Sequence, residues 1–424
     1  MQFSPILTSF ALLGALTLSS VPAALAQGGA QARSSADEVI LEMQRAYKRL
    51  DRKRLSALLP QAKGHALEPW GAYWELAARL DEAPTSEIQD FLTRYAGTYQ
   101  EDRLRNDWLL LLGKRRDWAT FSVEYPKYRM NDDRSVRCYA LFNAFASNGT
   151  DVAEQVQEAW LAQKEADDGC AAAAEQQLKA DKLKPHSAWL RATPGLENDR
   201  PRIATQAVAL LGKDRAETLN TVYSAPAKYL NAKFTALRPP TKELVTLALV
   251  RLAVVDPAAA AKELTKLRWK TQLTNEERAW VWGVIGKRAA QRLSGDALGY
   301  FEHAENKYLH DDHLAWKARA ALRAGQWQLV QEAIAAMSET QRKDPAWVYW
   351  SARALTRLAS TEAARAQANG LLQSIAGVRG FYEQLALEEL GQRITTAPKP
   401  PALTAEEKEA ARLNPGLNRG LYAI

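Results

Sequence analysis

Apolar residues recur with a helical period along most of the chain. The clearest stretch covers residues 314–392 and reads LAWKARAALRAGQWQLVQEAIAAM, then DPAWVYWSARALTRL, then GVRGFYEQLALEELGQ. Trp316 and Trp350 are 34 residues apart, and alanine follows each of them four residues later, at Ala320 and Ala354. Small residues at such positions let two helices approach closely. The pattern therefore predicts pairs of short helices that repeat along the chain.

The same spacing recurs near the N-terminus, where Trp74, Trp108 and Phe142 follow one another at intervals of 34 residues. A repeat of this length built from two short helices is typical of tetratricopeptide-like solenoids. We therefore predict an all-α fold, a right-handed α-superhelix of TPR-like helical hairpins that forms a U- or ring-shaped solenoid. Such a coil is more often an interaction surface than a catalyst.

Local signals predict where several helices begin and end. One helix is expected over residues 39–59 and should end at Pro60. Thr85-Ser86 with Glu87, and Asp344 before Pro345, are predicted helix starts, whereas Gly97, Gly113 and Gly325 are predicted helix ends. Between residues 151 and 260, irregularly spaced prolines predict short helices joined by tight turns. No segment shows the alternation of a strand.

The two ends of the chain differ from the rest. Residues 1–26 combine an uncharged apolar run with Ala24-Leu25-Ala26, which is typical of a secretory signal peptide cleaved after Ala26. Residues 396–401 are rich in proline, and Thr404 then begins a new helix with Glu407 three residues on. We therefore expect a signal peptide over 1–26, an α-superhelical domain over 35–395, and a linker with the start of a truncated linker domain over 396–424.

The charge and the apolar segments restrict the partners. The 424 residues carry a formal net charge of +7, which favours an anionic partner. In an exported protein this would be an anionic cell-wall polymer or a membrane surface, and not nucleic acid; solvated surface charge alone explains the excess equally well. Outside the signal peptide no segment is long and apolar enough to span a bilayer, so no stable membrane insertion is expected.

The chain has two cysteines, Cys138 and Cys170. In an exported protein an isolated pair is more often bridged than free. Their separation is about one helical repeat, which suits a disulfide between adjacent hairpins. Two buried free thiols are the alternative. A metal site is not expected, because no further Cys or His lies at ligand spacing beside either residue.

The remaining candidates for chemistry have simpler structural interpretations. His310 and His313 have a spacing that can place two imidazoles on one helix face, but Asp311 or Asp312 between them fits the N-cap of the next helix. We prefer the capping interpretation and expect no metal, no cofactor and no catalytic residue. The neighbouring Glu388 and Glu389 point about 100° apart on a helix and are interpreted as surface residues or as partners of a neighbouring arginine.

Aromatic and basic residues of the 314–392 stretch are candidates for contacts. Trp316, Trp327, Trp347, Tyr349 and Trp350 lie in helix-core patterns, and stacking on sugar rings is the alternative. Arg319, Arg323 and Arg353 lie on adjacent predicted helices. Together with Trp350, they are candidates for contact with a glycan or with a catalytic domain.

These residues also carry a family resemblance. The runs AWKARAALRAGQWQLVQEAIAAM, DPAWVYWSARAL and GFYEQLALEELG resemble the superhelical domain of soluble lytic murein transglycosylases. FLTRYAGTYQEDRLRNDWL, RRDWATFSVEYP and VRCYALFNAF resemble that family's opening helices, and Cys138 and Cys170 fall where its members carry a cysteine pair. The resemblance covers residues 35–424. It implies a periplasmic protein that acts on peptidoglycan.

The resemblance further implies a lysozyme-like C-terminal domain, which cleaves the β-1,4 bond between N-acetylmuramic acid and N-acetylglucosamine and leaves a 1,6-anhydro sugar. The catalytic Glu of that domain stands in a Glu-Ser pair, followed by Gly-Leu-Met-Gln and later Asn-Ala-Gly. None of these strings occurs in the 424 residues. We therefore expect this chain to lack the catalytic module, so that any enzyme activity of its own is uncertain.

The expected function is that of a scaffold. It would hold peptidoglycan glycan strands for a lysozyme-like catalytic domain that normally follows in the same chain. The alternative is a non-catalytic helical-repeat adaptor that binds another protein of the cell envelope.

Overall fold

The structure is a computed structural model that describes residues 34–395 and 399–423. Throughout this part of the chain every regular element is a helix, and no strand is present. The all-α prediction is therefore confirmed. The predicted signal peptide over residues 1–26 lies outside the described residues. The chain divides into two compact units, one ending at Leu111 and resuming at Leu403, the other covering Leu112–Ala402. The sequence-based division at residues 395 and 396 stays a prediction.

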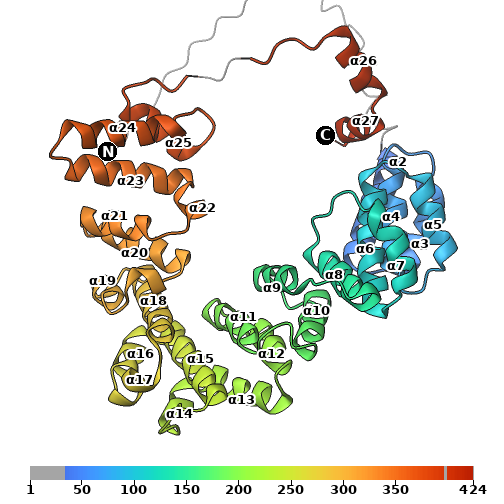
Figure 1. The fold of residues 1–424 in the computed structure, drawn as a ribbon. Coiled ribbons are helices and arrows are strands. Elements are labelled where there is room, and N and C mark those ends of the chain that lie inside the picture. The colour runs from blue at the N-terminus through green and yellow to red at the C-terminus, as the bar shows by residue number, and fades with distance from the viewer. Residues whose placement is uncertain (1–33, 396–398, 424) are drawn as a thin grey trace, which may run out of the picture. The chain divides into compact units, whose positions relative to one another are not determined.

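The first unit contains the N-terminal helices and the last two helices of the chain (Figure 1). Its helices are α2 (Ser34–Lys48), α3 (Arg52–Ala62), α4 (Glu68–Ala78), α5 (Thr85–Arg94), most of α6 (Tyr99–Arg115), α26 (Ala405–Leu413) and α27 (Pro415–Tyr422). Within this unit the Tyr422 hydroxyl donates a hydrogen bond to Asp37 Oδ1 at 2.8 Å.

The second unit is a succession of short helices in which chain neighbours pack as hairpins, for example α11 with α12 and α20 with α21 (Figure 1). Its α-helices are α7 (Trp118–Glu124), α8 (Arg134–Asn148), α9 (Ala153–Ala162), α10 (Asp168–Lys179), α11 (His186–Glu197), α12 (Pro201–Ala209), α13 (Lys213–Ser224), α14 (Pro226–Asn231), α15 (Pro239–Val255), α16 (Pro257–Leu264), α17 (Leu267–Gln272), α18 (Asn275–Gln291), α19 (Ala297–Phe301), α20 (Asp311–Arg323), α21 (Trp327–Ala335), α22 (Glu339–Arg342), α23 (Pro345–Leu358), α24 (Glu362–Ile375) and α25 (Phe381–Glu389). Two 3-10 turns accompany them, η1 (Tyr125–Lys127) and η2 (Asn306–Tyr308).

The core of the second unit is continuous along the coil. One cluster of buried residues extends from Cys138 on α8 to Ala354 on α23, and it includes the fully buried rings of Trp160, Trp269 and Phe301. A smaller cluster joins α23 to α24 and α25. Each helix therefore buries its apolar face against its neighbours, as expected when a repeat protein stabilises itself locally.

The aromatic residues spaced by 34 positions lie on alternate helices at the N-terminal end. Trp74 is on α4, Trp108 on α6 and Phe142 on α8, while Trp316 is on α20 and Trp350 on α23. All of them are buried or packed against a core cluster. The core interpretation of the periodic aromatics is thus confirmed, whereas the tetratricopeptide-like label for the hairpins stays a prediction.

Two predicted helix ends and one helix predicted as continuous need correction. The helix expected over residues 39–59 is two helices, because Leu50 adopts φ +55° and Asp51 caps α3 by accepting a hydrogen bond from Arg54 N. Pro60 lies inside α3 and does not end it. Gly113 does not end a helix either: it lies within α6, where an added Cβ would approach the Tyr139 ring to 2.3 Å. Tertiary packing, not helix termination, explains that glycine.

The other predicted starts and ends are mostly correct. Gly97 and Gly325 follow helices with φ of +80° and +69°, the left-handed conformation that glycine adopts most readily. Asp344 caps α23, and Thr404 forms the predicted capping box with Glu407. Helix α5 begins at Thr85 as predicted, but Pro84 is its N-cap and no side chain caps it.

The disulfide is formed. Cys138 on α8 and Cys170 on α10 are both fully buried and are bonded to each other, with 4.8 Å between their Cα atoms. The alternative of two free thiols is therefore wrong. Beside the bond, Gly169 lies so close to Ser135 that a Cβ there would be 2.5 Å from the Ser135 carbonyl oxygen. The glycine thus allows the close approach of the two helices that the disulfide fixes.

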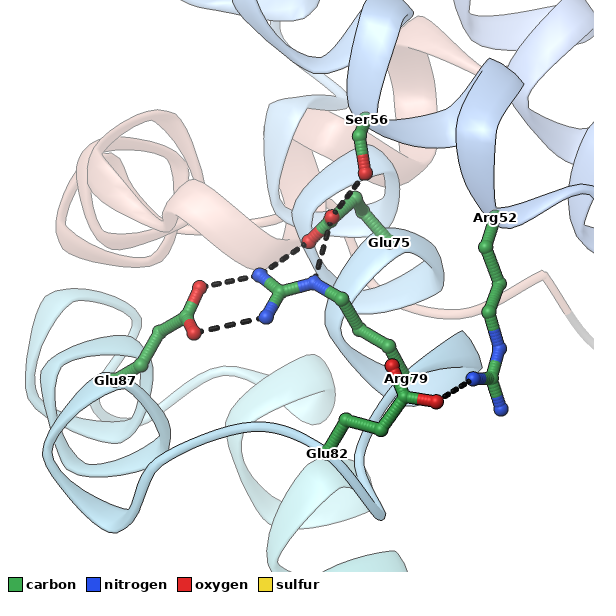
Figure 2. A network of polar contacts seen from close by, with 6 residues as sticks. All are labelled: Arg52, Ser56, Glu75, Arg79, Glu82 and Glu87. Atoms are coloured by element: carbon green, nitrogen blue, oxygen red, sulfur yellow. Dashed lines mark hydrogen bonds and ion pairs between the residues drawn. The ribbon is translucent and has the colours of Figure 1, made fainter.

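A polar network ties three helices of the first unit together (Figure 2). Arg79, which follows α4, donates from Nε to Glu75 Oε1 at 2.8 Å and from Nη1 to Glu87 Oε2 at 2.8 Å. The Ser56 hydroxyl of α3 donates to the buried Glu75 carboxylate at 2.7 Å. The Arg79 guanidinium accordingly holds the pKa of Glu87 below its ordinary value. Arg79 and Glu75 together therefore link α3, α4 and α5.

Candidate functional site

The candidate site is a cavity of about 650 Å³ in the second unit, between helices α11, α15 and α18. Each helix contributes side chains from its first two turns: His186 and Trp189 from α11, Lys242 and Glu243 from α15, Glu277 and Trp280 from α18. Leu190, Leu237 and three prolines complete the apolar part of the lining. A cavity of this size and composition is in the range that binds small ligands.

Local sequence explains why three helices begin at this cavity. Pro185 is the N-cap of α11, and Pro239 and Pro240 open α15, where the fixed φ of proline suits the first turn. Thr274 and Glu277 form a capping box at the start of α18. Because the N-terminal end of a helix is partly positive, Glu276 and Glu277 in the first turn of α18 complement its dipole.

Four charged or titratable groups of the cavity form two pairs across helices, while Arg215 and Glu276 also line it. His186 Nδ1 lies 3.2 Å from Glu243 Oε1, and Lys242 Nζ lies 3.0 Å from Glu277 Oε1. Burial raises the pKa of Glu243, and the neighbouring His186 only partly opposes that shift. The cavity therefore offers hydrogen-bond donors and acceptors of both signs around an apolar surface.

A buried charge network lies behind the cavity wall. At the end of α11, Glu197 Oε1 accepts a hydrogen bond from Lys287 Nζ at 2.7 Å and lies 3.2 Å from His313 Nε2. Its other oxygen, Oε2, accepts a hydrogen bond from Trp280 Nε1 at 3.1 Å. Lys287 is also paired with Asp312. The network thus joins α11, α18 and α20 and fixes the indole of Trp280, which lines the cavity.

The electrostatics of this network favour its charged form. Burial alone would raise the pKa of Glu197, but His313 and Lys287 outweigh it and hold the pKa well below its ordinary value. For Lys287 the penalty of burial is likewise exceeded by Glu197 and Asp312, so its pKa is raised. A carboxylate and an ammonium group, each almost fully buried, therefore stabilise each other.

The predicted N-cap at residues 311 and 312 is wrong. Helix α20 begins at Asp311, with His310 as N-cap and no side-chain cap. Asp311 instead accepts hydrogen bonds from Ser338 N and Oγ, and Asp312 pairs with Lys287. His313 is buried against Gly283, where an added Cβ would be 2.3 Å from His313 Nδ1. Sequence reasoning missed Glu197, Lys287 and Trp280; the only local signal was a charged residue within an apolar helix pattern.

The contact residues predicted from sequence are only partly brought together. Arg319 lies over the rings of Trp316 and Trp347, 5.0 Å from each centroid, and it lines two small hollows. Trp350 shares one hollow with Arg319, and Arg323 shares the other. Arg353 lines neither of these hollows and pairs with Glu389. Their role in binding a glycan or a catalytic domain stays a proposal.

Comparison with known proteins relates this fold to one group. No protein-family model matches the chain. The soluble lytic murein transglycosylase of Salmonella typhimurium is 21% identical over 384 residues, which cover 86% of this chain and 55% of that protein. The chain is homologous to soluble lytic murein transglycosylase. This finding confirms the resemblance stated from the sequence motifs.

Solved structures agree on the fold. The lytic transglycosylase Slt of Pseudomonas aeruginosa, crystallised as an inactive mutant, has a TM-score of 0.58 and 22% identity, covering 91% of this chain and 62% of that chain. The 70-kDa soluble lytic transglycosylase of Escherichia coli has a TM-score of 0.52 and 16% identity, covering 92% of this chain and 63% of that chain. The chain thus spans just over half the length of its curated relative. Among the described residues, no helix is long and apolar enough to cross a membrane.

Proposed function

We propose that this chain is a peptidoglycan-binding helical scaffold of a periplasmic lytic transglycosylase, and that its described helices are not catalytic. The observation that carries the proposal is the homology, which covers 86% of the chain. The net charge of +7 supports it, because the cell-wall polymers of the envelope include anionic ones. The absence of the Glu-Ser and Gly-Leu-Met-Gln strings supports the non-catalytic part.

Sedimentation with purified sacculi tests the binding part of the proposal. The chain should be retained in the pellet, and retention should decrease with added salt if the basic surface contributes. A charge-reversal variant at Arg319 and Arg323 tests the predicted contact residues, with reversal at Lys213 and Lys343 as a control of equal charge change. Lack of retention of the folded chain at low salt would overturn scaffold binding.

Zymography on murein tests the non-catalytic part separately. We expect no clearing zone from this chain, because it contains none of the catalytic strings of the family. A reproducible clearing zone from the pure chain would contradict this expectation and would indicate that carboxylates of this chain are catalytic.

The adaptor alternative has one observation in its favour. Leu413 at the end of α26 and Leu417 and Leu421 on α27 are exposed leucines. Exposed apolar side chains that lie close together are typical of protein contact surfaces. If the folded chain ignores sacculi but is crosslinked through these helices to an envelope protein, the adaptor function replaces the scaffold function.

A further inference from the structure

We propose that the cavity between α11, α15 and α18 is a saccharide-binding subsite for N-acetylated amino-sugar units. The inference rests on the proposed function and gives it a location. The cavity of about 650 Å³ exceeds the space of a single side chain and falls within the range of roughly 300–1,000 Å³ typical of small-ligand sites. It is therefore large enough for a short segment of a glycan.

The aromatic side of the cavity is held in place before any ligand arrives. Trp280 is half-buried and lines the cavity, while its indole N–H donates to Glu197 at 3.1 Å. Glu197 is itself fixed by Lys287 and His313. An indole that cannot rotate presents a constant apolar face, on which the C–H face of a sugar ring can stack. The ring therefore loses its conformational entropy when the chain folds, and not when a ligand binds.

The polar side of the cavity suits a ligand rich in hydroxyl and amide groups. Two cross-helix pairs, His186 with Glu243 and Lys242 with Glu277, line it together with Arg215 and Glu276. A paired carboxylate can still accept a hydrogen bond from a sugar hydroxyl, and a paired ammonium can still donate one to an acetamido carbonyl.

Leu237 at the rim can be replaced so that the cavity is blocked without disturbing the core. Leu237 lines the cavity but is 75% exposed in the loop before α15. A long cationic side chain there should fill the entrance at little cost in stability. Phe234, three residues earlier, is 80% exposed and does not line the cavity. Leu237→Arg and Phe234→Arg therefore add the same charge to one loop, and only the first obstructs the site.

Calorimetric titration of the full chain with tetra-N-acetylchitotetraose tests the proposal. We expect saturable binding that Leu237→Arg weakens at least tenfold and Phe234→Arg leaves within twofold. Glu243→Gln should weaken binding about fivefold, since it removes one acceptor charge and its pairing with His186. Fluorescence should report a ligand-dependent change that is lost in Trp280→Phe, and the urea midpoint of that variant establishes that it is folded.

The outcomes separate the subsite from the scaffold function. If the chain sediments with sacculi but does not bind chitotetraose, or if Leu237→Arg binds it as well as the unaltered chain, the subsite is wrong and the scaffold function stands. If chitotetraose binds in the cavity but sacculi are ignored, the scaffold function fails instead. If a peptidoglycan stem peptide, and not the saccharide, binds in a manner sensitive to Leu237→Arg, the saccharide assignment is overturned.

Discussion

At the scale of single residues, Glu197 organises more of the second unit than any other side chain described above. Its carboxylate accepts hydrogen bonds from Lys287 and Trp280 and faces His313, and its carbonyl oxygen accepts one from Arg288. Burying a carboxylate is costly unless its partners are charged and well placed. The partners of Glu197 meet this condition. The residue therefore both stabilises the packing of three helices and sets the orientation of the Trp280 indole in the cavity.

Replacing this carboxylate should be strongly destabilising. Glu197→Gln leaves the almost fully buried Lys287 without its main charge partner, and we expect a loss of roughly 3–5 kcal/mol in the free energy of unfolding. Urea unfolding followed by circular dichroism measures it. The matched control is Glu339→Gln, in an exposed pair with Lys343, which should change stability by less than about 0.5 kcal/mol. Equal effects of the two variants would contradict the role of the network.

The same residue predicts a pH dependence. The pKa of Glu197 in the fold lies below its ordinary value of 4.5, so its stabilising contribution is fully present above that pH. The contribution is lost as the pH falls towards the lowered pKa of the folded state. The stability difference between the unaltered chain and Glu197→Gln should therefore be constant near neutrality and shrink below about pH 4. A difference that grew on acidification would show that the sign is wrong.

At the scale of elements, glycines control how closely helices approach. Gly113 in α6 faces the ring of Tyr139, and Gly286 in α18 faces the ring of Phe301. In both places an added Cβ would lie within 3 Å of ring atoms. Glycine weakens a helix by about 1 kcal/mol relative to alanine, so its presence at these positions indicates that packing outweighs helix propensity.

Two alanine substitutions separate packing from propensity. Gly113→Ala should destabilise by roughly 1–3 kcal/mol, because Cβ would be 2.3 Å from the Tyr139 ring. Gly370→Ala in α24 meets no atom within 4 Å and should stabilise by about 0.5–1 kcal/mol through helix propensity alone. Thermal or urea unfolding measures both. A stabilising Gly113→Ala would mean that α6 and α8 can separate without cost.

At the scale of the whole molecule, stability is distributed over many local interfaces, since each helix of the second unit packs mainly against its neighbours. The cavity belongs to this arrangement. It exists because three helix starts meet where α11, α15 and α18 pack. A substitution in the network behind it should therefore act on these helices and their neighbours, and not on the chain as a whole.

Hydrogen exchange of Glu197→Gln tests this locality. We expect faster amide exchange in α11, α18 and α20, which carry the network, and unchanged exchange in α3–α5, which have their own polar network around Arg79. Mass spectrometry of peptic fragments resolves the two regions. Uniform acceleration along the chain would show that the helices unfold as one cooperative unit.

Much of the fold could be predicted from the sequence because its causes are local. Helical periodicity, the cap at Asp344, the capping box at Thr404 and the cysteine pair all depend on residues within about one repeat of one another. The sequence by itself therefore determined the all-α class, several helix starts, the disulfide and the relationship to lytic transglycosylases.

Only the tertiary structure decided the candidate site. The partners of Glu197 lie 83, 90 and 116 residues away along the chain, at Trp280, Lys287 and His313. Gly113 was predicted to end a helix, whereas in the structure it packs against the Tyr139 ring. The physical reason is common to both. Helix formation is governed by neighbouring residues, whereas charge pairing and close packing depend on which helices meet, and no local pattern encodes that.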